Sequence, residues 1–122
     1  MIGYATLGTN DMPRATAFYD ALFATLGAKR VWSTDRLVAW STSPTASSLA
    51  VGRPFDGKPA SVGNGVMIAL QVDSKAKVDA VHAKALALGG KDEGAPGQRS
   101  EDFYAGFFRD LDGNKLDVCF MG

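Results

Sequence analysis

The clearest structural pattern of the chain stands in residues 4–27, YATLGTNDMPRATAFYDALFATLG. Residues alternate loosely from Ile2 to Thr9, as in a strand, and Asn10-Asp11 then offers side-chain oxygens that can cap a helix. Pro13 lies in the first turn of that helix, where its missing N–H costs nothing. An apolar stripe at helical spacing follows, formed by Ala15, Phe18, Leu22 and Leu26. The pattern predicts a strand and then a helix over about Met12–Leu26, which a glycine ends.

Three strand-like segments follow this helix and complete a first series of elements. They are rich in Val, Trp, Leu and Ala, are separated by turn residues, and span Lys29–Thr34, Arg36–Thr42 and Ser48–Pro54. The next segment, about residues 55–64, is rich in glycine and reads as a linker.

The same series of elements returns in the second half of the chain. Val66–Val72 predicts a strand, Asp73-Ser74 offers a second helix cap, and the helix stops at Gly89-Gly90. An apolar stripe marks this helix, formed by Val78, Val81, Ala85 and Leu88. The remaining predicted elements are a weak strand at Lys91–Glu93, a Gly/Pro-rich loop to about Ser100, and strands at Phe103–Arg109 and Lys115–Phe120.

The two series align closely enough to indicate a duplicated module. When Leu7 is laid on Leu70, three further identities fall into place: Ala17 on Ala80, Ala24 on Ala87 and Gly27 on Gly90. The matched order of caps, stripes and stops is the stronger evidence. We therefore expect one α+β domain with two βαβββ modules, at about residues 1–54 and 65–122.

Composition excludes several classes of protein. The chain has 122 residues, 13 basic and 13 acidic, so its formal net charge is zero and it lacks the positive field that nucleic-acid binding needs. No apolar run approaches the roughly 20 residues of a membrane span, and the first residues lack the features of a signal peptide. The single cysteine, Cys119, has no partner for a disulfide and fits a reducing compartment. A cytoplasmic protein that binds neither nucleic acid nor membrane is the expectation.

Two motifs carry a resemblance to a known family. The first runs from Tyr4-Ala5-Thr6-Leu7 through Asn10-Asp11-Met12-Pro13-Arg14-Ala15 to Phe18-Tyr19, and the second is Arg109-Asp110-Leu111-Asp112-Gly113-Asn114-Lys115-Leu116-Asp117. Together they resemble the vicinal oxygen chelate superfamily, which includes glyoxalase I, bleomycin-resistance proteins and extradiol dioxygenases. The resemblance implies a curved mixed sheet around a cavity, and usually a homodimer. In metal-using members it also implies a divalent ion held by a His/His/Glu set.

The positions that correspond to those metal ligands carry other residues here. They fall on Tyr4, Met67 and Asp117. A thioether is a soft ligand, and a tyrosine whose pKa lies near 10 is mostly protonated at neutral pH, so one carboxylate would remain for a hard ion. We expect no tightly held cofactor, although a weakly held divalent metal stays open. The remaining histidine and thiol, His82 and Cys119, are better explained by structural roles.

Aromatic and basic residues of the predicted strands are the other candidates for ligand contacts. Trp32, Trp40, Tyr104 and Phe107 could line a cavity, with core or dimer packing as the alternative. Arg53 and Arg109 could meet an anionic group, with surface ion pairs as the alternative.

Two functions follow from the resemblance. The first is a metal-independent protein that binds a small, partly aromatic molecule. The second is a lyase, isomerase or dioxygenase with a rearranged site, in which Asp117 would act as general base and Tyr4 as proton donor. An interaction module that has lost its pocket is a third.

Overall fold

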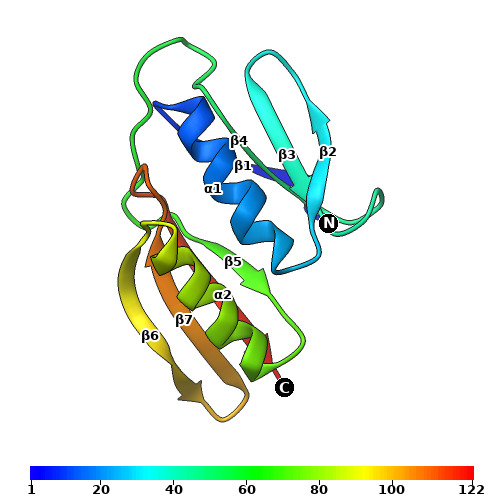
Figure 1. Ribbon diagram of the computed structural model, residues 1–122, viewed down its shortest axis with the longest axis vertical. Helices are drawn as coiled ribbons and strands as arrows, with labels where there is room; N and C mark the ends of the chain where they lie inside the picture. Colours follow the sequence, from blue (N-terminus) through cyan, green and yellow to red (C-terminus); the bar gives the residue numbers. More distant parts are fainter. The chain divides into compact units, whose positions relative to one another are not determined.

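The computed structural model describes residues 1–122, which form two compact units, Met1–Val62 and Gly63–Gly122. The boundary falls inside the predicted linker. Each unit has one helix packed on a four-stranded mixed sheet, as Figure 1 shows. Neither helix has the length and apolar character that a transmembrane segment requires. The predicted α+β fold with two βαβββ modules is confirmed.

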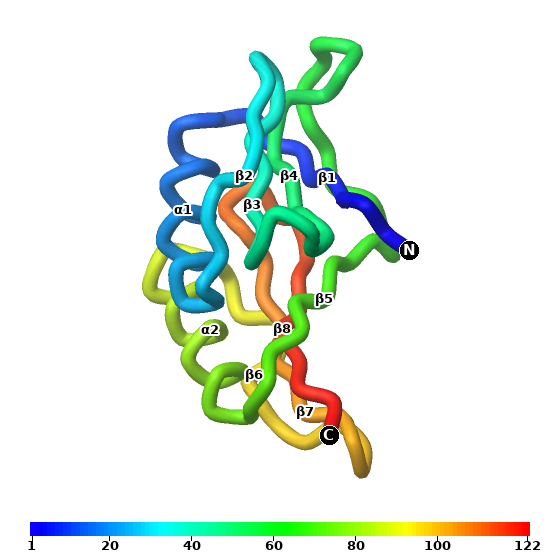
Figure 2. Tube along the Cα trace, turned by 90° about the vertical axis from the view of Figure 1, so that its right-hand side faces the viewer, coloured from blue at the N-terminus to red at the C-terminus, as the bar shows by residue number.

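The first unit contains a helix and four strands. These are β1 (Tyr4–Gly8), α1 (Met12–Ala24), β2 (Lys29–Ser33), β3 (Leu37–Ser41) and β4 (Ser48–Gly52). The sheet order is β1-β4-β3-β2, in which β1 and β4 run parallel and the other neighbours antiparallel. In Figure 2, α1 runs along one side of the strands β2, β3 and β4. The opposite side of the sheet is therefore free of the unit's own helix.

Local signals start and stop α1 as the sequence predicts. The Asp11 side chain caps the helix by accepting the Arg14 N–H at 3.1 Å, and proline occupies the first turn. The helix ends at Ala24, slightly earlier than expected, and Gly27 then adopts a φ of 71°. Apolar residues pack between α1 and the sheet: Ala15, Phe18, Tyr19, Leu22, Phe23, Trp40 and Val51. This packing fixes which face of the first sheet is the core.

The second unit repeats the plan. Its elements are β5 (Ile68–Gln71), α2 (Lys75–Ala87), β6 (Lys91–Ser100), β7 (Phe103–Arg109) and β8 (Lys115–Met121), in the sheet order β5-β8-β7-β6. Ser74 caps α2 by accepting the Lys77 N–H, and the helix lies over β7 in Figure 1. Gly113, at a φ of 89°, permits the tight hairpin between β7 and β8.

The sequence-based prediction is wrong for one element. The stretch predicted as a weak strand and then a Gly/Pro-rich loop is a single ten-residue strand, β6. It tolerates Gly94, Pro96 and Gly97 because it is an edge strand, which needs a hydrogen-bond ladder on one side only. The register with β7 shifts at both glycines, so the breaker residues lie at irregularities of the ladder.

Candidate functional site

Each sheet has a helix face, packed against the unit's own helix, and an opposite face that we call the open face. In the first sheet, Trp40 marks the helix face, because its ring contacts α1 and its indole N–H donates to Asp20 at 2.9 Å. Side chains alternate along strands, so the neighbouring residue, Ala39, belongs to the open face. The register then places Thr6, Ala50, Ala39 and Trp32 in one row across that face.

Two aromatic side chains meet over this row. Tyr4 comes from one edge strand and Trp32 from the other, yet their ring centroids are 5.2 Å apart at an angle of 79°. A register shift between Arg30 and Trp32 turns the tryptophan toward the open face. The rings can approach each other because the central strands carry only alanines there, Ala39 and Ala50, both fully buried. Tyr4 remains 55% exposed, so this pair is accessible to a ligand.

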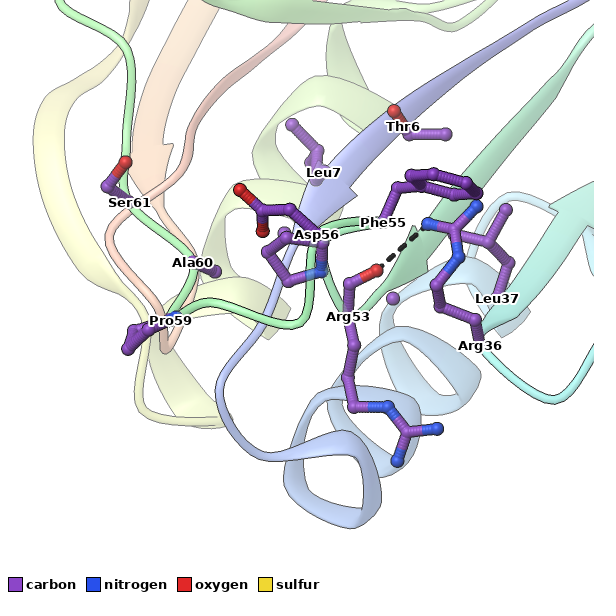
Figure 3. Close-up of a pocket in the computed structure, with 13 residues that line it drawn as sticks. Thr6, Leu7, Arg36, Leu37, Arg53, Phe55, Asp56, Pro59, Ala60 and Ser61 are labelled. Atoms are coloured by element: carbon purple, nitrogen blue, oxygen red, sulfur yellow. Dashed lines mark hydrogen bonds between the residues drawn. The ribbon is translucent and has the colours of Figure 1, made fainter.

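A hollow of about 460 Å³ lies at one end of the same sheet, and of the row above only Thr6 lines it. Its walls come from the ends of β1, β3 and β4 and from the loop that follows β4 (Figure 3), through Thr6, Leu7, Gly8, Arg36, Leu37, Gly52, Arg53, Pro54, Phe55, Asp56, Pro59, Ala60 and Ser61. The row Gly8–Gly52–Leu37 lies two residues along the strands from the row that contains Trp32. That step is roughly 7 Å along the strands, so Trp32 and the hollow share one face of the sheet, although neither Trp32 nor Tyr4 lines the hollow.

Glycines and one asparagine give the hollow its shape. A Cβ on Gly52 would lie 2.1 Å from the Arg36 carbonyl oxygen, and one on Gly8 would lie 2.9 Å from the Ala60 side chain. The Asn10 side chain holds the loop through two bonds to Ala60, accepting its N–H at 2.7 Å and donating to its carbonyl at 3.1 Å. The hollow is therefore built into the folded unit.

Two arginines lie at the mouth of the hollow. In Figure 3 the Arg36 guanidinium lies beside the Phe55 ring and donates to the Arg53 carbonyl. The hydrogen bond is 2.9 Å long, and the guanidinium carbon lies 5.4 Å from the ring centre. Arg53 in turn donates to the Asp35 carbonyl at 2.8 Å. A second hollow of about 480 Å³ shares both arginines and adds Lys58. The electrostatic field here is set by cations that backbone oxygens hold in place.

The open face of the second sheet carries different chemistry. Asp117 on β8 pairs in register with Ala69 and Phe107, and it is only 2% exposed. Its Oδ1 has no hydrogen-bond partner. Burial raises the pKa of Asp117 above its ordinary value, against the opposing effects of the Cys119 thiol and the Lys115 ammonium group. This carboxyl therefore holds its proton more strongly than an exposed one.

The neighbours of Asp117 do not form a nucleophile. Burial, and then the nearby carboxyl, raise the pKa of Cys119 to about 11, so very little thiolate exists at neutral pH. Phe107 lies between two cations, with the Arg99 guanidinium 5.3 Å and the Lys115 ammonium 5.5 Å from its ring centre. The face combines a buried acid with an aromatic ring and two positive charges.

Comparison with known proteins identifies the family of the chain. Residues 1–118 match the model of the Glyoxalase/Bleomycin resistance protein/Dioxygenase superfamily. The chain belongs to this superfamily. A glyoxalase/bleomycin resistance protein of Albidiferax ferrireducens is 33% identical, with a TM-score of 0.92, over 100% of this chain and 99% of that one. The resemblance inferred from the two motifs is confirmed.

More distant structures support the fold alone. A lactoylglutathione lyase of Agrobacterium tumefaciens is 23% identical, with a TM-score of 0.71, over 98% of this chain and 92% of its own. A hypothetical protein of S. aureus is also 23% identical, with a TM-score of 0.76 and the same coverage. No curated protein matched the sequence.

The divalent ion of the superfamily's metal-using members does not fit the residues present here. The three corresponding positions offer a phenol, a thioether and a single carboxyl: Tyr4, Met67 and Asp117. The described chain contains no cluster of three or more His, Cys, Asp or Glu residues that could hold a metal. A thioether is a poor ligand for a hard ion, and burial, which raises the pKa of Asp117, weakens its carboxyl as a ligand.

The only histidine of this superfamily member has a structural position. His82 is 5% exposed on the helix face of the second sheet. Its Nε2 lies 3.2 Å from an Asp92 carboxylate oxygen and 3.1 Å from the Phe107 carbonyl. Because both partners are acceptors, Nε2 donates. His82 therefore links α2 to β6 and β7.

Three further candidate residues lie away from the open faces or are already paired. Trp40 is buried under α1, and the Tyr104 hydroxyl donates to Asp79 of α2 at 2.7 Å, so both belong to helix faces. Arg109 donates to Glu93 at 2.9 Å and to the Gly113 carbonyl at 3.0 Å, the ion-pair alternative for this residue. The structure brings together Tyr4 and Trp32 in one unit, and Phe107 and Asp117 in the other.

Sequence reasoning missed two residues of the hollow, Arg36 and Phe55. Both lie outside recognisable motifs, in a turn and in the segment that reads as a linker. The only signal was the spacing of Arg53 and Phe55 just after a strand, which is too short to indicate a site.

Proposed function

We propose that this superfamily member binds a small, partly aromatic molecule on the open face of its first module, without a bound metal. The observation that carries the proposal is the preformed hollow of about 460 Å³ on the same sheet face as Trp32. Its volume lies within the range of small-molecule sites, Phe55 supplies an aromatic wall, and the Tyr4–Trp32 pair adds aromatic surface to the same face. The residues at the superfamily's metal-ligand positions also favour binding without a metal, because they suit a hard divalent ion poorly.

The tryptophans provide a matched test of this proposal. In a Trp40→Phe variant, Trp32 is the only tryptophan, and we expect saturable quenching by at least one compound in a panel of aromatic metabolites and antibiotics. In a Trp32→Phe variant the remaining reporter, Trp40, is buried under α1 and should respond far less. Both proteins are treated with a chelator first.

Three results would contradict the proposal. One is the absence of saturable quenching and of thermal shift across the panel. Another is equal quenching of both variants, which would move the ligand away from Trp32. The third is a stoichiometric divalent ion in protein purified without a metal-affinity tag.

An enzyme is the second candidate, and Asp117 is the observation that favours it. A buried carboxyl with a raised pKa and an unpartnered oxygen on an open face suits proton transfer. This function predicts lyase, isomerase or dioxygenase activity that Asp117→Ala abolishes. Glyoxalase-type and dioxygenase assays of both proteins, with and without added divalent metal, test it; equal rates in both proteins would remove Asp117 from the reaction.

We also propose that the protein is a cytoplasmic homodimer whose partner is a small molecule, rather than nucleic acid or membrane. Large apolar side chains away from the proposed ligand contacts are exposed in both units, as a subunit interface requires: Ile2, Val66, Met67 and Met121. The free, buried Cys119 fits a reducing compartment. Light scattering of the purified protein should give twice the mass of one chain.

A further inference from the structure

The two arginines of the hollow differ from most other arginines of the chain in how their charge is held. Arg30 is paired with Asp20 at 2.7 Å, and Arg109 is paired with Glu93 at 2.9 Å. Arg36 and Arg53 donate to backbone carbonyls instead, and neither forms an ion pair with a carboxylate. A carbonyl fixes the position of a guanidinium without neutralising its charge. Two positive charges without carboxylate partners therefore lie at the hollow, with the Arg36 guanidinium directed toward Phe55 and the Arg53 guanidinium directed away from it (Figure 3).

The acids nearest to these arginines do not compensate them. Asp35 receives Arg53 through its backbone carbonyl, and the Asp56 carboxylate accepts the Lys58 backbone N–H at 2.9 Å. Figure 3 shows the Asp56 carboxylate and the Arg53 guanidinium directed to different sides of the hollow. With Lys58 in the adjoining hollow, the basic side chains outnumber the acidic ones. The field at this end of the module favours an anion.

An exposed aromatic ring lies directly against one of these charges. Phe55 is 90% exposed, although its loop is held in place through Asn10 and Ala60. The Arg36 guanidinium covers part of the ring. A bare phenyl group favours an apolar partner, because covering it removes apolar surface from water. The ring and the guanidinium groups together match a flat ligand that carries a negative charge at one end.

We propose that this hollow selects aromatic anions: the ligand ring packs on Phe55, its carboxylate, sulfonate or phosphate group accepts hydrogen bonds from Arg36, and the Arg53 charge adds to the positive field. This inference rests on the proposed binding function and names its ligand class. Each guanidinium has five N–H groups and makes one hydrogen bond, so donors remain for an anion.

The test compares two probes that share a ring system. The 2-naphthoate ion carries a carboxylate, and 2-naphthamide carries a neutral amide at the same position. Isothermal titration of chelator-treated protein should give a Kd for naphthoate at least about tenfold below that for the amide, which corresponds to about 1.4 kcal/mol. Arg53→Met and Arg36→Met should each weaken naphthoate binding about five- to tenfold, and Arg53→Met should leave the amide unchanged within about twofold.

A matched control removes a positive charge elsewhere in the same module. Lys29→Met alters an exposed residue of β2 outside the hollow, with the same change in net charge, and should leave both affinities unchanged. Equal affinities for the two probes, or insensitivity to both arginine variants, would overturn the anion selectivity while the proposed binding function stands. No binding of either probe, in a protein whose thermal unfolding is intact, would overturn this inference; if the compound panel also failed, the proposed function would fall with it.

Discussion

The two modules share one frame and differ in what they place on its open face. The pair Thr6–Ala50 of the first sheet corresponds to Ala69–Asp117 of the second, since both join the same parallel strands at the same register. One step further, Gly8–Gly52 corresponds to Gln71–Cys119. The first module has small residues at these positions and a hollow beside them, whereas the second has a buried acid and a thiol.

The helix faces, in contrast, are apolar in both modules. The first is packed with large aromatic rings around α1, including Phe18, Tyr19 and Trp40. The second uses smaller aliphatic residues with Phe108 and His82 around α2. Both sets exclude water and hold the helix on its sheet. The helix faces therefore do the same packing work in both modules, whereas the open faces differ in their chemistry.

The largest expected effect comes from adding one carbon to the first open face. Gly52→Ala would push a Cβ against the Arg36 carbonyl oxygen, 2.1 Å away, so β3 and β4 must separate. We expect a loss of about 2–3 kcal/mol in the free energy of unfolding, measured in urea, together with weaker binding of 2-naphthoate.

The equivalent position of the second module supplies the control for this substitution. Cys119→Ala also leaves an alanine, but it removes the sulfur atom instead of adding a carbon. The free energy of unfolding should fall by about 1 kcal/mol or less. Equal losses in the two variants would show that the open faces are packed alike, and the comparison would fail.

A smaller effect should depend on pH and belong to the second module alone. Because burial raises the pKa of Asp117 in the folded protein, the unfolded chain ionises first as the pH rises. The wild-type protein should therefore lose stability relative to Asp117→Asn as the pH rises above the ordinary value of 3.8, while the two agree near pH 3. Urea unfolding between pH 3 and 8 measures the difference.

The opposite outcome has a clear meaning. A stability difference between wild type and Asp117→Asn that stays constant over the same pH range would mean that the Asp117 carboxyl is solvated in solution.

Most of the fold could be predicted from the sequence because its signals are local. The Asp11 and Ser74 caps, the apolar stripes and Gly113 each act within a few residues, and all are found in the predicted places. The β6 strand was not predicted because its composition is rich in Gly and Pro, which are rare in strands. Its pairing with β7 stabilises it, and that pairing is not visible in the local sequence.

The candidate site could be predicted from the sequence less completely than the fold, for a geometric reason. Tyr104 and Phe107 lie three residues apart on one strand, so regular alternation places them on opposite faces, yet it does not say which face the helix covers. Trp32 reaches the open face through a register shift that no residue pattern announces. The hollow depends on Phe55 and Arg36, whose positions are set by a loop fastened to Asn10.

The smallest effect should come from Tyr104→Phe, which tests whether the faces are assigned correctly. The variant loses one hydrogen bond to Asp79, the group that raises the pKa of the Tyr104 hydroxyl, at the outer surface of α2. Water replaces such an exposed partner readily, so the urea midpoint should scarcely change. Binding of 2-naphthoate and 2-naphthamide should also stay the same, because the ring lies on the helix face of the second module. A severalfold loss of affinity for either probe would instead make Tyr104 a ligand contact. The assignment of ligand binding to the open faces and of packing to the helix faces would then be wrong.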